Sequence, residues 1–392
     1  MKKVMILAAA AALVLAGCSK NEITENPGRV PENMLVGFST YTPRAITKAD
    51  ANYYVDGTSV TNLVSGKTFG VYAWNTANTT TPWSVNNNLF NGSGTPDFMN
   101  NVPVTFSGAT AGADGSANIS SAGYYSAGNP VRYWPSGDTP DGLSFFAYYP
   151  ANAAGLTLSA NGLGATTFQV QSTSAAQIDY MVSNVVADQY YGHTNSTYLS
   201  GAAGTVDLTF HHTLTKVQFK FKTDLSAAEL SNTTVKLTGA SLSGIFDTNV
   251  LTTGYSAGAT ANSGTFSYNW GTATNAAAFD ITVNNAKPVD TNVTLSNSES
   301  TVVAADVFLM VPQDIAAGQQ KISLTWTVTT AGHTTTNTKT FDLNDIKNGS
   351  ADIDWGKNQQ ITYTITVGPK PVYFTATVAN WDTETTGSLT VN

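Results

Sequence analysis

The sequence predicts an all-β protein made of two β-sandwich domains in series, with little helix. Charged residues make up only 11% of the 392 residues, against about 25% in an average globular domain. Thr, Ser, Asn and Gly take their place, and these residues favour strand faces and turns over helix surfaces. Short apolar or alternating segments, separated by clusters of Gly, Asn, Asp and Pro, follow one another along the chain. The 42% of hydrophobic residues is enough for a packed core, so disorder is not predicted.

The first 18 residues have the pattern of a bacterial lipoprotein signal. Lys2 and Lys3 precede an apolar run that ends in Leu-Ala-Gly-Cys, and Cys18 is the only cysteine of the chain. The run is shorter than the ~20 residues that cross a membrane, so residues 1–17 are predicted to be a cleaved signal peptide. The pattern resembles the lipobox, which implies acyl chains on Cys18 that hold the mature chain on a membrane. The alternative is a plain secretory signal followed by an incidental cysteine.

A first strand is predicted over residues 34–41, after a tether rich in turn formers. Met34, Val36 and Phe38 alternate with other residues and share one face of this strand. A Thr-Pro-Arg-Ala sequence then breaks the pattern, so the strand ends just before Arg44. Residues 18–44 therefore comprise the lipidated tether and this first strand.

The remainder divides into two predicted domains. The 375 residues left after the signal peptide (392 − 17) suit two domains of about 100–200 residues each. The stretch 188–205 is polar, glycine-rich and without period, so we place a linker within it. Residues 45–203 then form the N-terminal sandwich and residues 204–392 the C-terminal one. Strands are predicted at 68–74, 143–150, 179–183, 217–222, 307–311, 322–328 and 361–367. Ser226 and Glu229 have the spacing of a capping box on one short helical turn.

The charge and the side-chain chemistry argue against nucleic-acid binding and against an enzyme. A net charge of −8 with a pI near 4.9 lacks the basic face that nucleic acid requires. No serine lies in a Gly-x-Ser-x-Gly elbow, and no glycine-rich stretch ends like a phosphate-binding loop. His211 and His212 are adjacent on a strand, so they face opposite sides of the sheet and do not suit one metal. Asp352 and Asp354 suit either calcium or turn capping, and turn capping is the simpler interpretation. We expect no cofactor and no metal site.

Five blocks of the sequence together resemble the fimbrillin family, the lipoprotein-derived subunits of type V pili. Their order and spacing carry the resemblance, which covers nearly the whole chain. The blocks are Phe-Gly-Val-Tyr-Ala at 69–73, Tyr-Trp-Pro at 133–135 leading into 143–150, Phe-His-His-Thr-Leu-Thr-Lys-Val at 210–217, Leu-Met-Val-Pro-Gln at 309–313, and 374–381 ending in Trp381. The resemblance implies two transthyretin-like sandwiches and export to the outer membrane through the lipid on Cys18.

The resemblance also implies a mode of assembly. An Arg- or Lys-specific protease cuts in the loop after the first strand, at Arg44 or alternatively at Lys48. The strand bearing Met34, Val36 and Phe38 then leaves, and a strand from another copy or another fimbrillin takes its place. We nominate the tail with Leu389 and Val391, together with residues 373–379 upstream, as the donor. The product is a surface pilus that attaches to host or bacterial surfaces.

Two alternatives remain open at this stage. An uncut surface lipoprotein could use the seven tryptophans and seventeen tyrosines to bind glycans or host proteins. The chain could also serve as a tip or anchor accessory subunit rather than in the pilus shaft.

Overall fold

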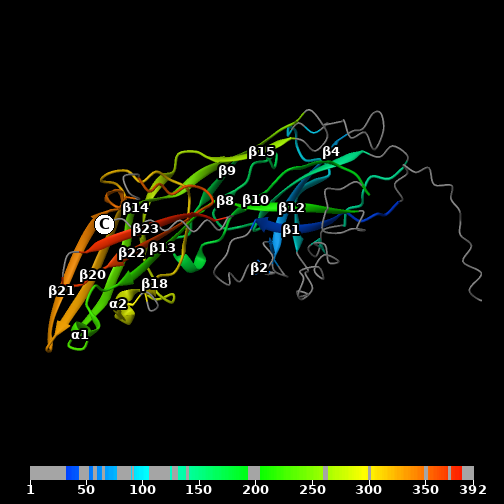
Figure 1. The fold of residues 1–392 in the computed structure, drawn as a ribbon. Helices are drawn as coiled ribbons and strands as arrows, with labels where there is room; N and C mark the ends of the chain where they lie inside the picture. Colours follow the sequence, from blue (N-terminus) through cyan, green and yellow to red (C-terminus); the bar gives the residue numbers. More distant parts are fainter. Residues whose placement is uncertain are drawn as a thin grey trace, which may run out of the picture.

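The structure is a computed structural model, and its fold is nearly all β, as predicted (Figure 1). It describes residues 32–43, 53–55, 60–63, 67–76, 90, 92–105, 124–125, 131–137, 141–192, 204–258, 264–298, 302–347, 352–369 and 372–381. Two short α-helices lie within these ranges, α1 (Ala227–Leu230) and α2 (Pro288–Thr291). No helix in this part of the chain has the length and apolar character to cross a membrane.

The first sheet has ten strands in the order β2-β3-β1-β12-β10-β7-β4-β5-β6, with β11 also paired to β7. Its members are β1 (Gly37–Pro43), β2 (Tyr53–Val55), β3 (Val60–Leu63), β4 (Thr68–Thr76), β5 (Met99–Thr105), β6 (Tyr124–Tyr125), β7 (Gly142–Tyr149), β10 (Met181–Ser183), β11 (Val186–Gln189) and β12 (Thr205–His212). The pairing of β1 with β12 is parallel, whereas the other pairs of this sheet are antiparallel.

Two further sheets pack on each other, and most of their strands come from the second half of the chain. The five-stranded sheet comprises β13 (Thr215–Lys222), β18 (Val303–Ala304), β19 (Phe308–Met310), β22 (Gln359–Thr366) and β23 (Tyr373–Asn380). The eight-stranded sheet comprises β8 (Leu156–Thr157), β9 (Gly164–Gln169), β14 (Thr233–Ser256), β15 (Thr265–Trp270), β16 (Thr274–Asp280), β17 (Val293–Thr294), β20 (Lys321–Thr330) and β21 (His333–Asp342).

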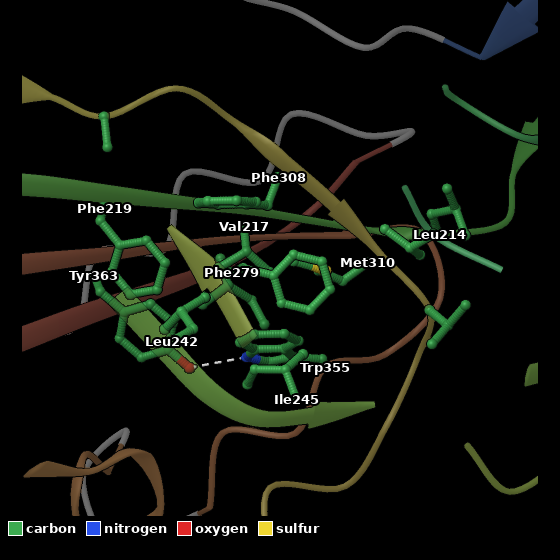
Figure 2. Packing of buried hydrophobic residues seen from close by; sticks show 14 of the residues in the cluster. Leu214, Val217, Phe219, Leu242, Ile245, Phe279, Phe308, Met310, Trp355 and Tyr363 are labelled. Atoms are coloured by element: carbon green, nitrogen blue, oxygen red, sulfur yellow. Dashed lines mark hydrogen bonds between the residues drawn. The ribbon is translucent and has the colours of Figure 1, made fainter. Parts of the chain in front are cut away.

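The core between these two sheets is rich in aromatic side chains. Phe219 stacks on Tyr363 with ring centroids 5.2 Å apart, and Phe279 meets Phe308 edge to face across the sheets at 6.3 Å. Trp355 donates from its indole Nε1 to the Tyr363 hydroxyl at 3.0 Å (Figure 2). This bond satisfies two polar atoms that burial would otherwise leave without water.

Strands β4 and β7 separate this core from a second one. Phe146 and Tyr148 of β7 belong to the core that is shared with the two C-terminal sheets. The alternate residues Phe145 and Ala147 belong to a second core, which is enclosed by strands of the first sheet. Every residue of β7 is buried, because both of its faces are covered. The continuous apolar run at 143–149 is the sequence sign of that position.

The strands do not follow the predicted boundary between residues 203 and 204. Strand β12 lies after that boundary but pairs with β1 and β10 of the first sheet, and β8 and β9 lie before it but pair in the eight-stranded sheet. Strands β11 and β12, at the two ends of this predicted linker, both belong to the first sheet, and the chain passes to the five-stranded sheet at Thr213 and Leu214, between β12 and β13. A polar, glycine-rich stretch is therefore not sufficient to mark a domain boundary.

Strand β14 is 24 residues long and is the central strand of the eight-stranded sheet. It pairs with β20 from Thr233 to Ser243 and with β9 from Thr248 to Thr253. Gly244 lies in the register shift against β16, with φ at +71°, a conformation that glycine adopts without strain. Figure 1 shows β14 running from the end that carries α1 and β21 toward β9 and β15.

Candidate functional site

Strand β1 and the three residues 34–36 directly before it form one extended segment, which is held by backbone on both of its sides and leaves or stays as a unit with β1. On one side it pairs in parallel with β12, from Gly37 opposite Thr205 to Tyr41 opposite Thr209. On the other side, Leu35 faces Tyr133 in an isolated antiparallel bridge. At its far end Thr42 and Pro43 pair with β3. We call the residues that hold this strand, namely Arg132–Trp134, Gly204, β12 and the side chains beneath, the β1 seat.

The backbone contacts around Leu35 are short and regular. The Val36 amide donates to the Arg132 carbonyl at 2.9 Å, and the Trp134 amide donates to the Met34 carbonyl at 2.7 Å. Across the strand, the Gly37 amide donates to the Gly204 carbonyl at 2.9 Å. An extended segment in this seat is therefore recognised largely through its main chain.

The side chains that this extended segment directs into the core lie at alternate positions. Val36 and Phe38 are fully buried, Met34 is half-buried, and Leu35 is 43% exposed. The Phe38 ring meets Phe69 of β4 at 6.1 Å and Phe145 of β7 at 5.6 Å, both edge to face. Because Val36 and Phe38 lie two positions apart, the seat accepts apolar side chains at alternate positions of a strand.

Trp134 connects the two sides of the seat beneath the strand. Its side chain is 2% exposed, and its Nε1 donates to the Gly204 carbonyl at 3.0 Å. Its ring lies edge to face on Phe145 at 5.8 Å. The Gly204 carbonyl thus accepts two hydrogen bonds, one from β1 and one from the indole. A Cβ on Gly204 would lie 2.7 Å from the Leu35 carbonyl oxygen, so glycine permits this close approach.

The seat combines backbone hydrogen-bonding groups with an apolar interior, the chemistry that suits an extended strand. Its inner surface is formed by Phe69, Phe145 and Trp134, with Val206 and Leu208 of β12. Arg132 lies at the margin, where its Nε donates to the Phe98 carbonyl at 3.3 Å. Over the residues that the structure describes, no three His, Cys, Asp or Glu side chains gather as metal ligands.

The sequence-predicted site residues fall into two groups. Met34, Val36 and Phe38 are brought together in the β1 seat. Cys18, Arg44, Lys48, Leu389 and Val391 lie outside the described residues. Arg44 directly follows Pro43, the last residue of β1. The upstream part of the nominated donor, residues 373–379, lies in β23 and pairs with β22 along its length.

The other residues considered for chemistry have structural partners. His211 stacks on Tyr268 at 5.7 Å and His212 on Trp381 at 3.9 Å, so the two histidines do face different neighbours. Asp354 accepts from the Ile315 amide at 3.0 Å, and Asp352 pairs with Lys347. Asp354 thus binds the backbone of a segment far from it in the sequence.

Most tryptophans are not available as a glycan-stacking platform. Five of the seven are at most 5% exposed, namely Trp74, Trp134, Trp326, Trp355 and Trp381. Stacking on a sugar requires an open ring face, which these side chains do not present.

Sequence reasoning missed the wall of the seat formed by Arg132–Trp134 and the role of Gly204. The sequence shows the Tyr-Trp-Pro block at 133–135. A three-residue extended segment, however, has too little periodicity to be identified as a pairing partner of the first strand. Gly204 lies at the end of the predicted linker, where glycine is common and does not indicate a specific contact.

Comparisons with known proteins agree with this architecture. A family model described as fimbrillin-like matches residues 58–381. The fimbrium subunit Fim1C of Phocaeicola vulgatus is 28% identical over 247 residues, which cover 60% of this chain and 55% of that protein. The chain thus matches about half the length of that curated relative. A solved fimbrial protein from Bacteroides vulgatus aligns with a TM-score of 0.54 at 17% identity, over 89% of this chain and 100% of that chain, and shows the same fold.

Proposed function

Because this chain belongs to the fimbrillin-like family, we propose that it is a structural pilus subunit that exchanges its strand β1 for a strand of a neighbouring subunit. The family is one of fimbrial proteins rather than of enzymes. In this proposal Cys18 carries the lipid for export to the outer membrane, and a protease cuts at Arg44 or Lys48. Other copies or other fimbrillins supply the incoming strand, and the finished pilus attaches to host or bacterial surfaces.

The observation that supports strand exchange is the position of β1. It is bonded on both sides, fills an apolar interior with Val36 and Phe38, and ends directly before Arg44. While the chain is intact, its own tether holds β1 at an effective concentration in the millimolar range, which a second molecule cannot match. A cut after Arg44 or Lys48 removes that advantage, so an exchange becomes feasible.

The energetics favour a durable joint between subunits. Each large side chain buried from water contributes about 1.5–3 kcal/mol, so two residues in the places of Val36 and Phe38 contribute roughly 3–6 kcal/mol before ordering costs. Main-chain bonds to Arg132, Trp134 and Gly204 fix the register. One seat and one donor per subunit form a head-to-tail contact that does not close, which produces a filament. Leu389 and Val391 have the alternate spacing that the seat accepts, so we retain them as donor candidates.

The test is to remove both basic residues of the cut loop. We expect the double substitution Arg44→Ala and Lys48→Ala to leave subunits that retain β1 and stay monomeric, as followed by N-terminal sequencing and electron microscopy of sheared surface material. Lys67→Ala is the matched control, since it removes a basic residue just before β4, and it should assemble normally. Normal pili from the double variant would overturn the proposal.

A further inference from the structure

We infer that Trp134 is a positioning residue that keeps the β1 seat open between the departure of β1 and the arrival of a strand from a second copy of this chain. This inference rests on the function proposed above. It concerns the state of the subunit that strand exchange requires but that the structure, with β1 in place, does not contain.

The hydrogen bonds of the wall divide into those that leave with β1 and those that stay. The bonds from Val36 to the Arg132 carbonyl and from the Trp134 amide to Met34 are lost when β1 leaves. The bond from Trp134 Nε1 to the Gly204 carbonyl and the bond from Arg132 Nε to the Phe98 carbonyl do not involve β1. Of these two, the indole bond links the wall to the start of β12, on the opposite side of the seat.

The packing of Trp134 supports the same role. Its ring lies on Phe145, whose strand β7 is buried along its whole length and is therefore a rigid base. The same Phe145 contacts Phe38 when β1 is present. The ring of Trp134 thus remains supported from below after Phe38 has gone.

An open seat matters for the rate of exchange. If the wall drifted away from β12, an incoming strand would have to order it again before pairing, and that ordering cost slows association. A wall held by the indole bond presents Arg132, Trp134 and Gly204 at the spacing that β1 already uses. The inference therefore predicts an effect of Trp134 on the association rate of the incoming strand.

The experiment uses the full chain with a site for a sequence-specific protease in place of residues 44–50. After the cut, exchange of β1 for a labelled peptide of residues 32–43 is followed by fluorescence anisotropy. Trp134→Phe keeps a ring on Phe145 but removes the Nε1 donor, and we expect peptide association to slow about tenfold, the equivalent of one hydrogen bond of about 1.4 kcal/mol. A purely structural contribution to the occupied seat would instead raise the dissociation rate.

Two controls accompany this variant. Trp326→Phe removes another buried indole bond, from Nε1 to the Gly368 carbonyl at 3.2 Å, outside the β1 seat, and it should leave the peptide kinetics unchanged. Tyr133→Phe alters an exposed side chain of the wall without touching its backbone, and it should also exchange like the wild type.

A measurement on the wild type covers the case in which Trp134→Phe does not fold. In the cut chain freed of β1 and labelled with ¹⁵N-tryptophan, the indole N–H of Trp134 should stay protected from hydrogen exchange, while its backbone N–H exchanges fast. Fast exchange at both positions, or an unchanged association rate in a folded Trp134→Phe variant, overturns the inference about Trp134 but not the proposed function. Failure of the wild-type cut chain to take up the peptide overturns the proposed function as well.

Discussion

The ring of Trp381 lies face to face on the imidazole of His212, with centroids 3.9 Å apart and planes 9° apart. His212 Nδ1 lies 2.8 Å from Asp179 Oδ2, and Lys216 Nζ lies 5.6 Å above the same tryptophan ring. His212 ends β12, the strand that borders β1, and Trp381 directly follows β23. The end of β12, a strand of the β1 seat, is therefore in direct contact with the residue that leads from β23 into the nominated donor tail.

Loss of the Trp381 ring should destabilise the whole molecule. Trp381 is 5% exposed, and truncation of a buried tryptophan to alanine costs about 3–5 kcal/mol. We expect this loss for Trp381→Ala in urea denaturation followed by circular dichroism. Trp381→Phe retains a stacked ring and should lose less than half as much. A value for Trp381→Ala within about 1 kcal/mol of wild type would show that the stack is incidental.

A disulfide between β1 and the wall should prevent assembly. Leu35 and Tyr133 form a bridge flanked by hydrogen bonds, the type of antiparallel pair whose Cα atoms lie about 4.5 Å apart, within the range that a disulfide spans. We expect Leu35→Cys with Tyr133→Cys, in a Cys18→Ser background, to stay monomeric after proteolysis when oxidised and to polymerise when reduced. Light scattering before and after reductant measures this.

The control for the lock is Leu35→Cys alone in the same Cys18→Ser background, which has no second cysteine in the chain to close the bridge. Its assembly should not respond to reductant. Polymers formed by the oxidised double variant would mean that β1 need not leave its seat.

The register shift in β14 should depend on glycine at position 244. A side chain there requires a positive φ and would also meet the backbone carbonyl of Gln319. Gly318 has a similar φ of +77° but open space around it, so Gly318→Ala isolates the conformational cost of about 1–2 kcal/mol. We expect Gly244→Ala to lose more stability than Gly318→Ala in thermal denaturation. Equal losses of stability would show that the contact with the Gln319 carbonyl adds no cost.

Alkaline pH should unfold the protein through its buried tyrosines. Burial raises the pKa of Tyr72, Tyr148 and Tyr180 above the ordinary value of 10, although Tyr148 also donates to Asn101 Oδ1 at 2.7 Å. The unfolded chain therefore releases these protons near pH 10 while the folded chain retains them, so stability is complete below pH 10 and falls above it.

Urea denaturation at pH 8 to 11.5, with tyrosinate absorbance near 295 nm, measures this effect. Tyr180→Phe removes one of the three groups, so the loss of stability above pH 10 should be shallower in this variant. A slope equal to that of the wild type would rule out Tyr180 as a contributor.

Sequence patterns predicted where the strands lie better than they predicted which strands pair with one another. The alternation in β13, β20 and β22 correctly identified which residues are buried, because alternation reports the two faces of a strand. The capping box of Ser226 and Glu229 is also confirmed on α1, because a cap is a local arrangement of a few residues. The same patterns carry no information on pairing, so the parallel contacts of β1 with β12 and of β13 with β22 could not be predicted.

The candidate site was predicted only in part for the same reason. The inward residues Val36 and Phe38 could be identified from their own strand, whereas the seat is assembled from segments at 69, 132–134, 145 and 204–209, far apart in sequence. The central strand β14 was also missed as one element. Its Ser, Thr and Gly residues have the composition of turns, and pairing with β20 and β9 determined its conformation.

The length of β14 has a mechanical consequence. At about 3.4 Å per residue, its 24 residues span roughly 80 Å, and the antiparallel bonds to β20 and β9 lie crosswise to that axis. A pull along β14 shears many of these bonds at once, whereas a pull across a strand peels them one after another. Tension applied along β14 therefore loads the molecule in the direction in which this sheet yields least.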